Sequence, residues 1–403
     1  MRLLAFVAVV VVVAVAAVLI RAATSATPAL AVERLVPASV RFPGPAPAPA
    51  WPKTGEAAVE VEGLGPLGSS GPQTPVPIAS VAKIMTAYVI LQDHPVAVGH
   101  PGFSVTIDSA DVADYRSRMA QSELVTPVAA GEVLTEVQLL QALLVASGNN
   151  IAPILAKHDA GSIAGFVTKM NVTARRLGMD HTTYTDASGV AATTVSTASD
   201  QLRLAVAAMK DPVFAQTVAM TSIKLPVAGS IPNFNHAVGT GGYVGIKTGS
   251  DAIAGGCLVF ADRQSIGGRT VTIVGVVLRQ DPGQPSTPIL TAASQAAADA
   301  LVQSVRSAIR TETVLPAGTP IASLSNADGV HSTAVTGSAI SEIGWGGMTE
   351  PINVALRHPG RSIADGATVA QVSVPSGEPA QVTATAGSAV PAVSFGWKVR
   401  HAL

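Results

Sequence analysis

The sequence predicts an α/β (α+β) body, in which a mainly antiparallel sheet is flanked by helices, followed by a small C-terminal all-β domain. Helical patterns follow one another between residues 136 and 209. Three segments rich in Val and Ile come next, and the last two, joined by the turn "QSIGG", predict an antiparallel hairpin. From about Glu312 only short alternating segments remain, broken by Gly, Ser and Pro. These three observations carry the predicted fold class.

The elements of the body follow in order along the chain. An alternating strand opens it, a buried helix comes next, four helical patterns follow, and three strands and a final helix close it. The closing helix is rich in Ala and Leu, which suits close packing on a sheet. The predicted ranges are 56–63 for the first strand, 136–146, 151–158, 162–177 and 196–209 for the helices, 243–248, 252–263 and 269–280 for the strands, and 291–310 for the last helix.

The N-terminus predicts export from the cytoplasm. Residues 3–20 are an unbroken apolar stretch between two arginines, about 27 Å long as a helix, close to the ~30 Å of a bilayer core. The small residues "TSA" at 24–26 allow cleavage, so residues 1–26 are either a signal peptide or an N-terminal membrane anchor. We expect a Pro/Ala-rich linker over 27–55, the body over 56–311 and the β domain over 312–403.

Composition excludes several classes of function. Charged residues make up 13% of the 403-residue chain and the net charge is -1, so no basic surface for nucleic acid is expected. The eight histidines are scattered and form no HExxH pair, and no glycine-rich phosphate-binding loop occurs. We therefore expect no metal, no cofactor and no nucleic-acid partner.

A serine and a lysine lie three residues apart in the apolar segment "PIASVAKIMTAYVIL". At helical spacing the side chains of Ser80 and Lys83 fall on one face and reach each other. The segment is apolar on nearly every side, so we expect burial, which lowers the pKa of a lysine towards the range where it accepts a hydroxyl proton. This predicts a nucleophile and its base. A lysine that reaches solvent from a core helix is the alternative.

Two further motifs place polar groups at breaks in the fold. Ser147-Gly148-Asn149 lies between two apolar helices. It either directs a hydroxyl and an amide into a cleft or simply caps the helices. Lys247-Thr248-Gly249 ends a predicted strand. Its lysine and hydroxyl suit a carboxylate, and the glycine lets a substrate backbone lie close, although a solvated turn fits the tripeptide equally.

Together the three motifs match the SxxK, SxN and KTG set of penicillin-binding proteins and class A β-lactamases. From about residue 57 to 310 the chain resembles the low-molecular-weight penicillin-binding D-alanyl-D-alanine carboxypeptidases, which are serine peptidases. The resemblance implies the serine β-lactamase/penicillin-binding-protein-like transpeptidase fold. It is carried by the segments 79–91, 139–158, 166–190, 196–205 and 247–260.

The resemblance also implies a role for each motif residue. Ser80 would form an acyl-enzyme with Lys83 as its base, while Ser147 would pass a proton to the leaving amine. Asn149 would hold the substrate amide. The carboxylate would bind Lys247 and Thr248, and the oxyanion would bind the backbone N–H groups of Ser80 and Ser250.

The implied partner is a peptidoglycan stem peptide ending in D-Ala-D-Ala, with β-lactams as covalent inhibitors and the membrane contacted through the N-terminal segment.

Some positions depart from the family pattern. Asn150 and Ile151 stand where relatives often have Asp-Ala, and Asp251 stands where they often have Thr. Arg279 is a candidate second partner for the carboxylate, or a surface arginine. Three alternatives to a carboxypeptidase remain: a D,D-endopeptidase with the same residues, a β-lactamase, and a catalytically silent wall-binding homologue. No ExxLN motif follows Asn149, which disfavours rapid β-lactam hydrolysis.

Overall fold

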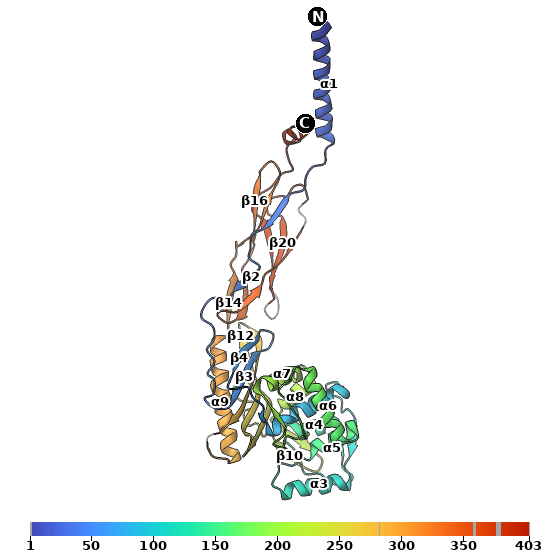
Figure 1. The fold of residues 1–403 in the computed structure, drawn as a ribbon, viewed down its shortest axis with the longest axis vertical. Coiled ribbons are helices and arrows are strands. Elements are labelled where there is room, and N and C mark those ends of the chain that lie inside the picture. Colours follow the sequence, from blue (N-terminus) through green and yellow to red (C-terminus); the bar gives the residue numbers. More distant parts are fainter. Residues whose placement is uncertain (1, 282, 358–359, 376–379, 403) are drawn as a thin grey trace. The chain divides into compact units, whose positions relative to one another are not determined.

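The computed structural model describes residues 2–281, 283–357, 360–375 and 380–402 and divides the chain into two compact units (Figure 1). The central unit is Pro47–Ala308. The terminal unit combines Met1–Ala46 with Ile309–Leu403. Because each unit has its own core, each is described by itself.

The central unit is built on a five-stranded antiparallel sheet in the order β11-β12-β13-β3-β4. The β12–β13 hairpin at its middle is formed by the two Val- and Ile-rich segments, so the predicted hairpin is confirmed. β11 lies at the edge, with Lys247 opposite Val259 and Thr248 opposite Leu258. The strands are β3 Glu56–Val61, β4 Gly65–Ser70, β11 Tyr243–Asp251, β12 Gly255–Ile266 and β13 Arg269–Gln280.

The first strand differs from its predicted alternation. Five of the six residues of β3 are buried, and only Glu60 is partly exposed. The reason is that β3 pairs with β13 on one side and β4 on the other, while helix α7 (Ala198–Met209) packs against it. Glu56 is one of the buried residues, and its carboxylate accepts hydrogen bonds from the backbone N–H groups of Thr74 and Ala198.

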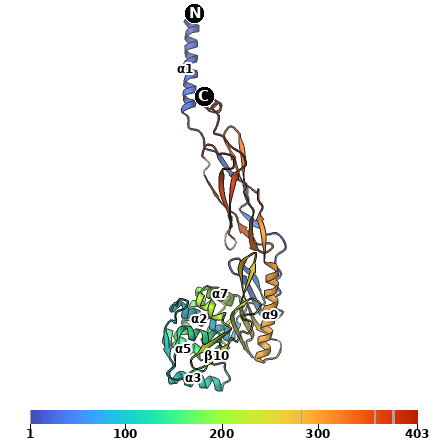
Figure 2. The same cartoon turned by 180° about the vertical axis from the view of Figure 1, so that it is seen from behind.

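Helices cover both faces of this sheet. Helix α9 packs along β11, β12 and β13, and Figures 1 and 2 both show it on the side away from the other helices. On the opposite side, α2 is surrounded by α4, α5, α6 and α7. The helices are η1 Ala79–Ala82, α2 Lys83–Asp93, α3 Ser109–Ala120, α4 Glu136–Leu144, α5 Ile151–Ala160, α6 Ile163–Arg176, α7 Ala198–Met209, α8 Pro212–Val218 and α9 Thr287–Ala308.

Side-chain caps explain where these helices begin. Thr135 caps α4 in a capping box, Ser162 caps α6 and Thr197 caps α7, each accepting an N–H bond three residues on. Asp108 caps α3, a polar helix that sequence periodicity did not predict. Short two-stranded ladders complete the unit: β5 Val76–Pro77 with β8 Val195–Ser196, β6 Ser104–Thr106 with β7 Val133–Thr135, and β9 Ser222–Leu225 with β10 Gly229–Pro232.

The terminal unit contains the β-rich C-terminal region. A six-stranded antiparallel sheet has the order β1-β15-β16-β21-β20-β19, and two small ladders pair β14 with β17 and β18 with β2. Its strands are β1 Ala31–Arg34, β2 Ser39–Arg41, β14 Arg310–Leu315, β15 Pro320–Ser325, β16 His331–Thr336, β17 Ile340–Gly344, β18 Thr349–Pro351, β19 Asn353–Leu356, β20 Thr368–Val374 and β21 Ala380–Ala386. The short helix α10 spans Phe395–Arg400.

Residues 27–46 differ from the predicted linker. β1 pairs with β15 and β2 with β18, so this segment supplies two strands to the terminal unit. Phe42 is 1% exposed, which shows that the segment also contributes to the core. The unit resumes at Ile309, three residues before the predicted boundary at 312. Before these strands, α1 (Arg2–Thr24) is long and apolar enough to cross a membrane.

Candidate active site

Ser80 and Lys83 lie where a single 3-10 turn passes into helix α2. In a 3-10 turn, side chains three residues apart are eclipsed, and Lys83 Nζ lies 2.6 Å from Ser80 Oγ. Lys83 is fully buried because α2 is enclosed by neighbouring helices. The alternative of a lysine that reaches solvent is therefore excluded.

The surroundings of Lys83 favour its uncharged form. Burial lowers the pKa of the Lys83 amine well below its usual value, and the charge of Lys247 lowers this pKa further. The carboxylates of Asp186 and Glu123 act in the opposite direction. Since burial is the largest cause, the amine favours its neutral form, which is able to accept a proton.

A tight loop braces the turn that carries Ser80. The carboxylate of Asp186 accepts hydrogen bonds from the N–H groups of Ser188 and Gly189, which closes the loop on itself. Gly189 has a φ of +82°, and a Cβ there would overlap the carbonyl oxygen of Ala79. Thr86 in α2 also donates a hydrogen bond to Ala187 O at 2.6 Å. The loop thus fixes both the turn and the helix that follows it.

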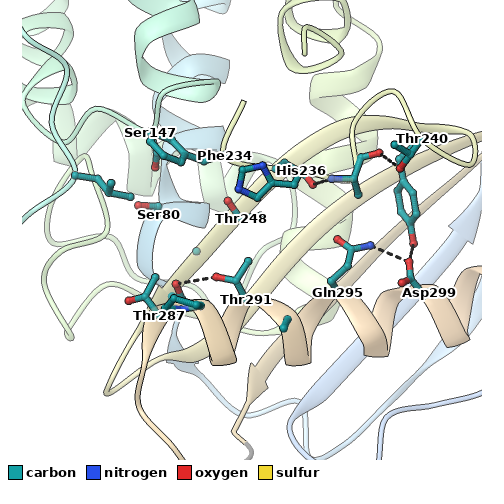
Figure 3. Close-up of a pocket in the computed structure, with 18 residues that line it drawn as sticks. Ser80, Ser147, Phe234, His236, Thr240, Thr248, Thr287, Thr291, Gln295 and Asp299 are labelled. Atoms are coloured by element: carbon teal, nitrogen blue, oxygen red, sulfur yellow. Dashed lines mark hydrogen bonds between the residues drawn. The ribbon is translucent and has the colours of Figure 1, made fainter. Parts of the chain in front are cut away.

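The second motif forms the break between α4 and α5. Ser147 has a left-handed backbone with φ of 55° and its side chain points into a cavity shared with Ser80 (Figure 3). Its hydroxyl is buried and has no hydrogen-bond partner among the described residues. Gly148 allows the close approach, since a Cβ there would overlap the hydroxyl of Thr126. The hydroxyl of Ser147 is therefore free to exchange a proton with a bound ligand.

Asn149 links the motif to Lys83. Its Oδ1 accepts a hydrogen bond from Lys83 Nζ at 2.6 Å, and its Nδ2 donates to Glu123 Oε2 at 2.9 Å. Glu123 in turn pairs with Arg118 at 3.0 Å. The Oδ1 of Asn149 and one of its two Nδ2 hydrogens are thus engaged within the protein, while the expected role of holding the substrate amide stays a prediction for the second Nδ2 hydrogen. Here the residue orients the amine.

Glu123 and Arg118 were not predicted from the sequence. They lie in a polar segment with no motif, and nothing local distinguishes them from surface charges. Asn150, which departs from the family pattern, has a structural use. It accepts from Thr126 N at 2.8 Å and donates to Thr126 O at 2.9 Å, which pins the segment that carries Glu123.

The third motif lies on the edge strand β11. A Cβ at Gly249 would be 3.0 Å from both Ile78 O and Ser80 N, so the strand runs directly beside Ser80. The Lys247 amine is buried and donates to Thr248 O at 3.0 Å. Burial lowers the pKa of Lys247 to about 7.

One cavity of about 590 Å³ collects most of the predicted residues (Figure 3). Ser80, Ser147 and the strand segment 248–250 line it, while Lys83 and Asn149 lie behind Ser80. Arg279 is exposed at the end of β13 and does not line the cavity. The remaining lining residues are Leu124, Phe234, Asn235, His236, Ala237, Thr240, Tyr243, Thr287, Pro288, Thr291, Ala292, Gln295 and Asp299.

This arrangement suits acyl transfer. A hydroxyl is paired with a buried amine, a second hydroxyl lies free in the same cavity, and the backbone N–H groups of a turn and an edge strand are adjacent. The three motifs are therefore one constellation and not three separate capping or turn motifs.

Comparison with known proteins agrees with this geometry. The profile of the D-alanyl-D-alanine carboxypeptidase family matches residues 66–281, more than half of the chain. A D-alanyl-D-alanine carboxypeptidase of Streptomyces sp. K15 is 33% identical over 49% of this chain and 71% of its own. A D-alanyl-D-alanine endopeptidase of Pseudomonas aeruginosa is 32% identical over 48% of this chain, and the match spans 61% of that relative.

Solved structures give the same fold. The Streptomyces K15 DD-transpeptidase superposes with a TM-score of 0.53 at 27% identity, covering 66% of this chain and all of its own. A peptidoglycan synthesis regulatory factor of Streptococcus pneumoniae has a TM-score of 0.59 over 85% of this chain, and at 20% identity it shows the fold alone. The predicted penicillin-binding-protein fold is confirmed, and the chain belongs to the D-alanyl-D-alanine carboxypeptidase family of low-molecular-weight penicillin-binding proteins.

Proposed function

We propose that this protein is a serine D-Ala-D-Ala carboxypeptidase that removes the terminal D-alanine of peptidoglycan stem peptides. The observation that carries the proposal is the buried Lys83 amine, 2.6 Å from the hydroxyl of Ser80. A neutral amine at this distance activates a serine that would otherwise be a weak nucleophile. Membership of the family supports the choice of substrate class.

In the first half-reaction, Ser80 Oγ bonds to the carbonyl carbon of the penultimate D-alanine while its proton passes to Lys83. The backbone N–H groups of Ser80 and Ser250 would stabilise the oxyanion. The amide C–N bond then breaks, and the leaving D-alanine nitrogen takes the proton held by Lys83, delivered through Ser147, so that Lys83 is neutral again. This role fits the unpartnered hydroxyl of Ser147.

The charge on the substrate explains the third motif. The leaving D-alanine carries a carboxylate, for which Lys247 and Thr248 would be the partners, with Gly249 leaving room for the peptide backbone. Water then attacks the ester, and Lys83 takes the proton of the water and returns it to Ser80 Oγ as the ester bond breaks. The products are the shortened peptide, ending in a new carboxylate, and free Ser80.

A β-lactam would acylate Ser80 in the same way and stay attached, because its ring-opened leaving group remains on the ester. The substrate lies outside the cytoplasm, so we further propose that α1 serves as a signal peptide or membrane anchor for an extracytoplasmic enzyme.

The test uses the full chain in detergent. Incubation with benzylpenicillin should add one inhibitor mass, and the adduct should be lost in Ser80→Ala. D-Alanine should be released from a pentapeptide by the wild type. Absence of an adduct would overturn the serine mechanism and favour a silent homologue. Rapid loss of the adduct with no D-alanine release would favour a β-lactamase.

A further inference from the structure

One segment of the cavity wall carries an amide that belongs to none of the three motifs. Residues 234–237 line the cavity together with Ser147, and Phe234 N donates to Val145 O at 3.2 Å, which places the segment beside the second motif. Figure 3 shows Phe234 and His236 in the part of the cavity where Ser147 and Thr248 are also drawn. The residue between them in the chain, Asn235, is therefore part of the site.

Hydrogen bonds fix the backbone of this segment. Asn233 is not among the described residues that line the cavity, and its Nδ2 donates to Met220 O at 2.8 Å. The Oδ1 of Asn233 accepts from Asn235 N at 2.8 Å, while Asn235 O accepts from Val238 N at 3.1 Å. Asn235 is thus held on both sides, so its position at the cavity does not depend on a ligand.

The side chain of Asn235 has a donor without an acceptor. The residue is 3% exposed, and its Nδ2 has no hydrogen-bond partner among the residues that the structure describes. Its Oδ1 accepts from Ala237 N at 3.3 Å, which identifies the other end of the amide as the nitrogen. This bond is long, so the amide can turn towards a ligand at little cost. A buried donor without a partner is unfavourable, and an acceptor that enters the cavity would supply one.

The proposed substrate brings such an acceptor, because its terminal carboxylate has two oxygens with about four lone-pair sites. No lysine or arginine is among the described residues that line the cavity. Arg279 lies outside it, and the Lys247 amine is buried and already donates to Thr248 O. Neutral donors are therefore needed beside Lys247 and Thr248 to complete the carboxylate site.

Position and access favour Asn235 over the two other polar residues nearby. Ser147 is assigned to the leaving nitrogen, and the carboxylate is attached to the carbon next to that nitrogen, so its partner should lie next to Ser147 along the wall. His236 is exposed, and water can satisfy its ring nitrogens. The Nδ2 of Asn235 is shielded from water and so gains more from a bond to the ligand.

We propose that Asn235 is a further substrate-binding residue, whose Nδ2 donates a hydrogen bond to the terminal carboxylate and so helps to select peptides with a free C-terminus. This inference deepens the proposed function and rests on it. Asn235 contacts the substrate without touching the reacting atoms, and it supplies the second carboxylate partner that Arg279 does not provide.

The experiment compares acylation of the full chain in detergent by benzylpenicillin and by its methyl ester, in which the carboxylate charge is removed. Both rates are measured by intact mass against time. Asn235→Asp keeps an acceptor for Ala237 N and replaces the donor by an oxygen that repels a carboxylate. The ratio of the benzylpenicillin rate to the ester rate should fall at least tenfold in this variant, because a hydrogen bond to a charged group is lost.

Two further variants separate binding from folding. Asn235→Ala removes the donor without adding a charge, and it should lower the same ratio several-fold. In the pentapeptide assay it should raise KM for D-alanine release several-fold, with a smaller change in kcat. Asn233→Ala is the matched control, because it removes a structural amide of the same segment outside the cavity lining. It should change both acylation rates by the same factor and leave their ratio as in the wild type.

The outcomes separate the two proposals. If both reagents acylate the wild type and their ratio is the same in the two Asn235 variants, the inference is overturned and the proposed function stands. An equal fall of the ratio in Asn233→Ala would also overturn the inference, since the effect would then come from the shape of the segment. A wild type that neither reagent acylates would overturn the proposed function itself.

Discussion

At the residue scale, the proposed chemistry depends on two lysines that burial keeps from water. Lys83 and Lys247 are nearly or fully inaccessible, and both have a lowered pKa for that reason. They serve opposite needs in the proposed reaction: Lys83 must be neutral to take a proton, whereas Lys247 is most useful as a cation. The two amines differ in their hydrogen-bond partners. Lys83 bonds to an asparagine oxygen and to the Ser80 hydroxyl, whereas Lys247 bonds to a backbone carbonyl.

The first prediction concerns Lys83→Arg. The guanidinium keeps the charge but does not give up its proton, so it cannot act as a base. We expect the rate of acylation by benzylpenicillin to fall by about 10²- to 10⁴-fold, the usual range for a general base, as measured by intact mass against time. Lys157→Arg, whose side chain is 48% exposed, is the control and should acylate at the wild-type rate. Equal rates in both variants would contradict the assignment.

The second prediction is a dependence of stability on pH. Between pH 7 and the ordinary lysine value of 10.5, Lys247 is neutral when folded and protonated when unfolded. The unfolded state binds more protons in this window, so the free energy of unfolding should rise with pH across it and fall back as pH drops towards 7. Lys247→Met should flatten the rise in urea-unfolding measurements from pH 7 to 10. An unchanged slope would show that the amine titrates normally.

The third prediction concerns Glu123, which holds Asn149 so that its oxygen faces Lys83. Glu123→Gln can donate as well as accept, so the orientation of Asn149 is no longer fixed, and acylation should slow by about tenfold. The carboxylate also raises the pKa of Lys83, so the pH–rate profile of acylation should shift to lower pH in the variant. Asp114→Asn is the control, because Asp114 pairs with Arg118, and this variant should leave the pH–rate profile unchanged. A slower rate with no shift would indicate a purely structural role.

At the element scale, the site is assembled from two helix ends and one sheet edge. Ser80 lies in a 3-10 turn before α2, Ser147 in the break between α4 and α5, and Thr248 on the edge strand β11. A helix end and a sheet edge each leave backbone groups without partners inside the element, which makes them available to a ligand. The loop around Asp186 and Gly189 keeps the turn in place, so its packing should matter to both stability and acylation.

The fourth prediction compares two glycines with left-handed backbones. Gly178 has open space around it, so Gly178→Ala should cost only the conformational strain of about 1–2 kcal/mol. In Gly189→Ala the methyl group also overlaps Ala79 O, and the turn or the loop has to move. We expect a larger loss of unfolding free energy in urea and a slower acylation of Ser80. Equal losses at the two sites would show that the loop does not brace the turn.

At the scale of the whole molecule, the chain crosses from the terminal unit into the central unit and back. Residues 27–46 supply β1 and β2 to the terminal unit, and Ile309 onward supplies the rest. All residues that line the active-site cavity belong to the central unit. Stability of the terminal unit and acylation in the central unit should therefore be separable.

The fifth prediction tests this separation with Phe42→Ala. Phe42 is buried against Gly344, and truncation should cost about 3–5 kcal/mol in the terminal unit. Leu35→Ala, 45% exposed in the same segment, is the control and should cost less than about 1 kcal/mol. Unfolding should show two transitions. Phe42→Ala should lower the stability reported by one of them and leave the other unchanged, and this second transition is identified by its response to benzylpenicillin. A lowered acylation rate would contradict the separation.

The sequence alone determined the main helices and the central hairpin of the body and pointed to the candidate reactive groups. Periodicity located α4 to α7 and the β12–β13 hairpin, because amphipathic spacing and β-branched runs are local properties. Spacing also paired Ser80 with Lys83, since three residues are one 3-10 turn. The resemblance to a known family linked these residues to the second and third motifs.

Only the tertiary structure decided what surrounds these groups. The depth at which Lys83 is buried, the support of Asn149 by Glu123 and the strands formed by residues 27–46 come from contacts between segments far apart in the chain. The part of the active-site cavity between β11 and α9 is of the same kind, because its two walls lie some 40 residues apart in sequence. Such contacts leave no periodic pattern in the sequence. The partner of a buried residue can lie anywhere in the chain and can be any residue of suitable chemistry.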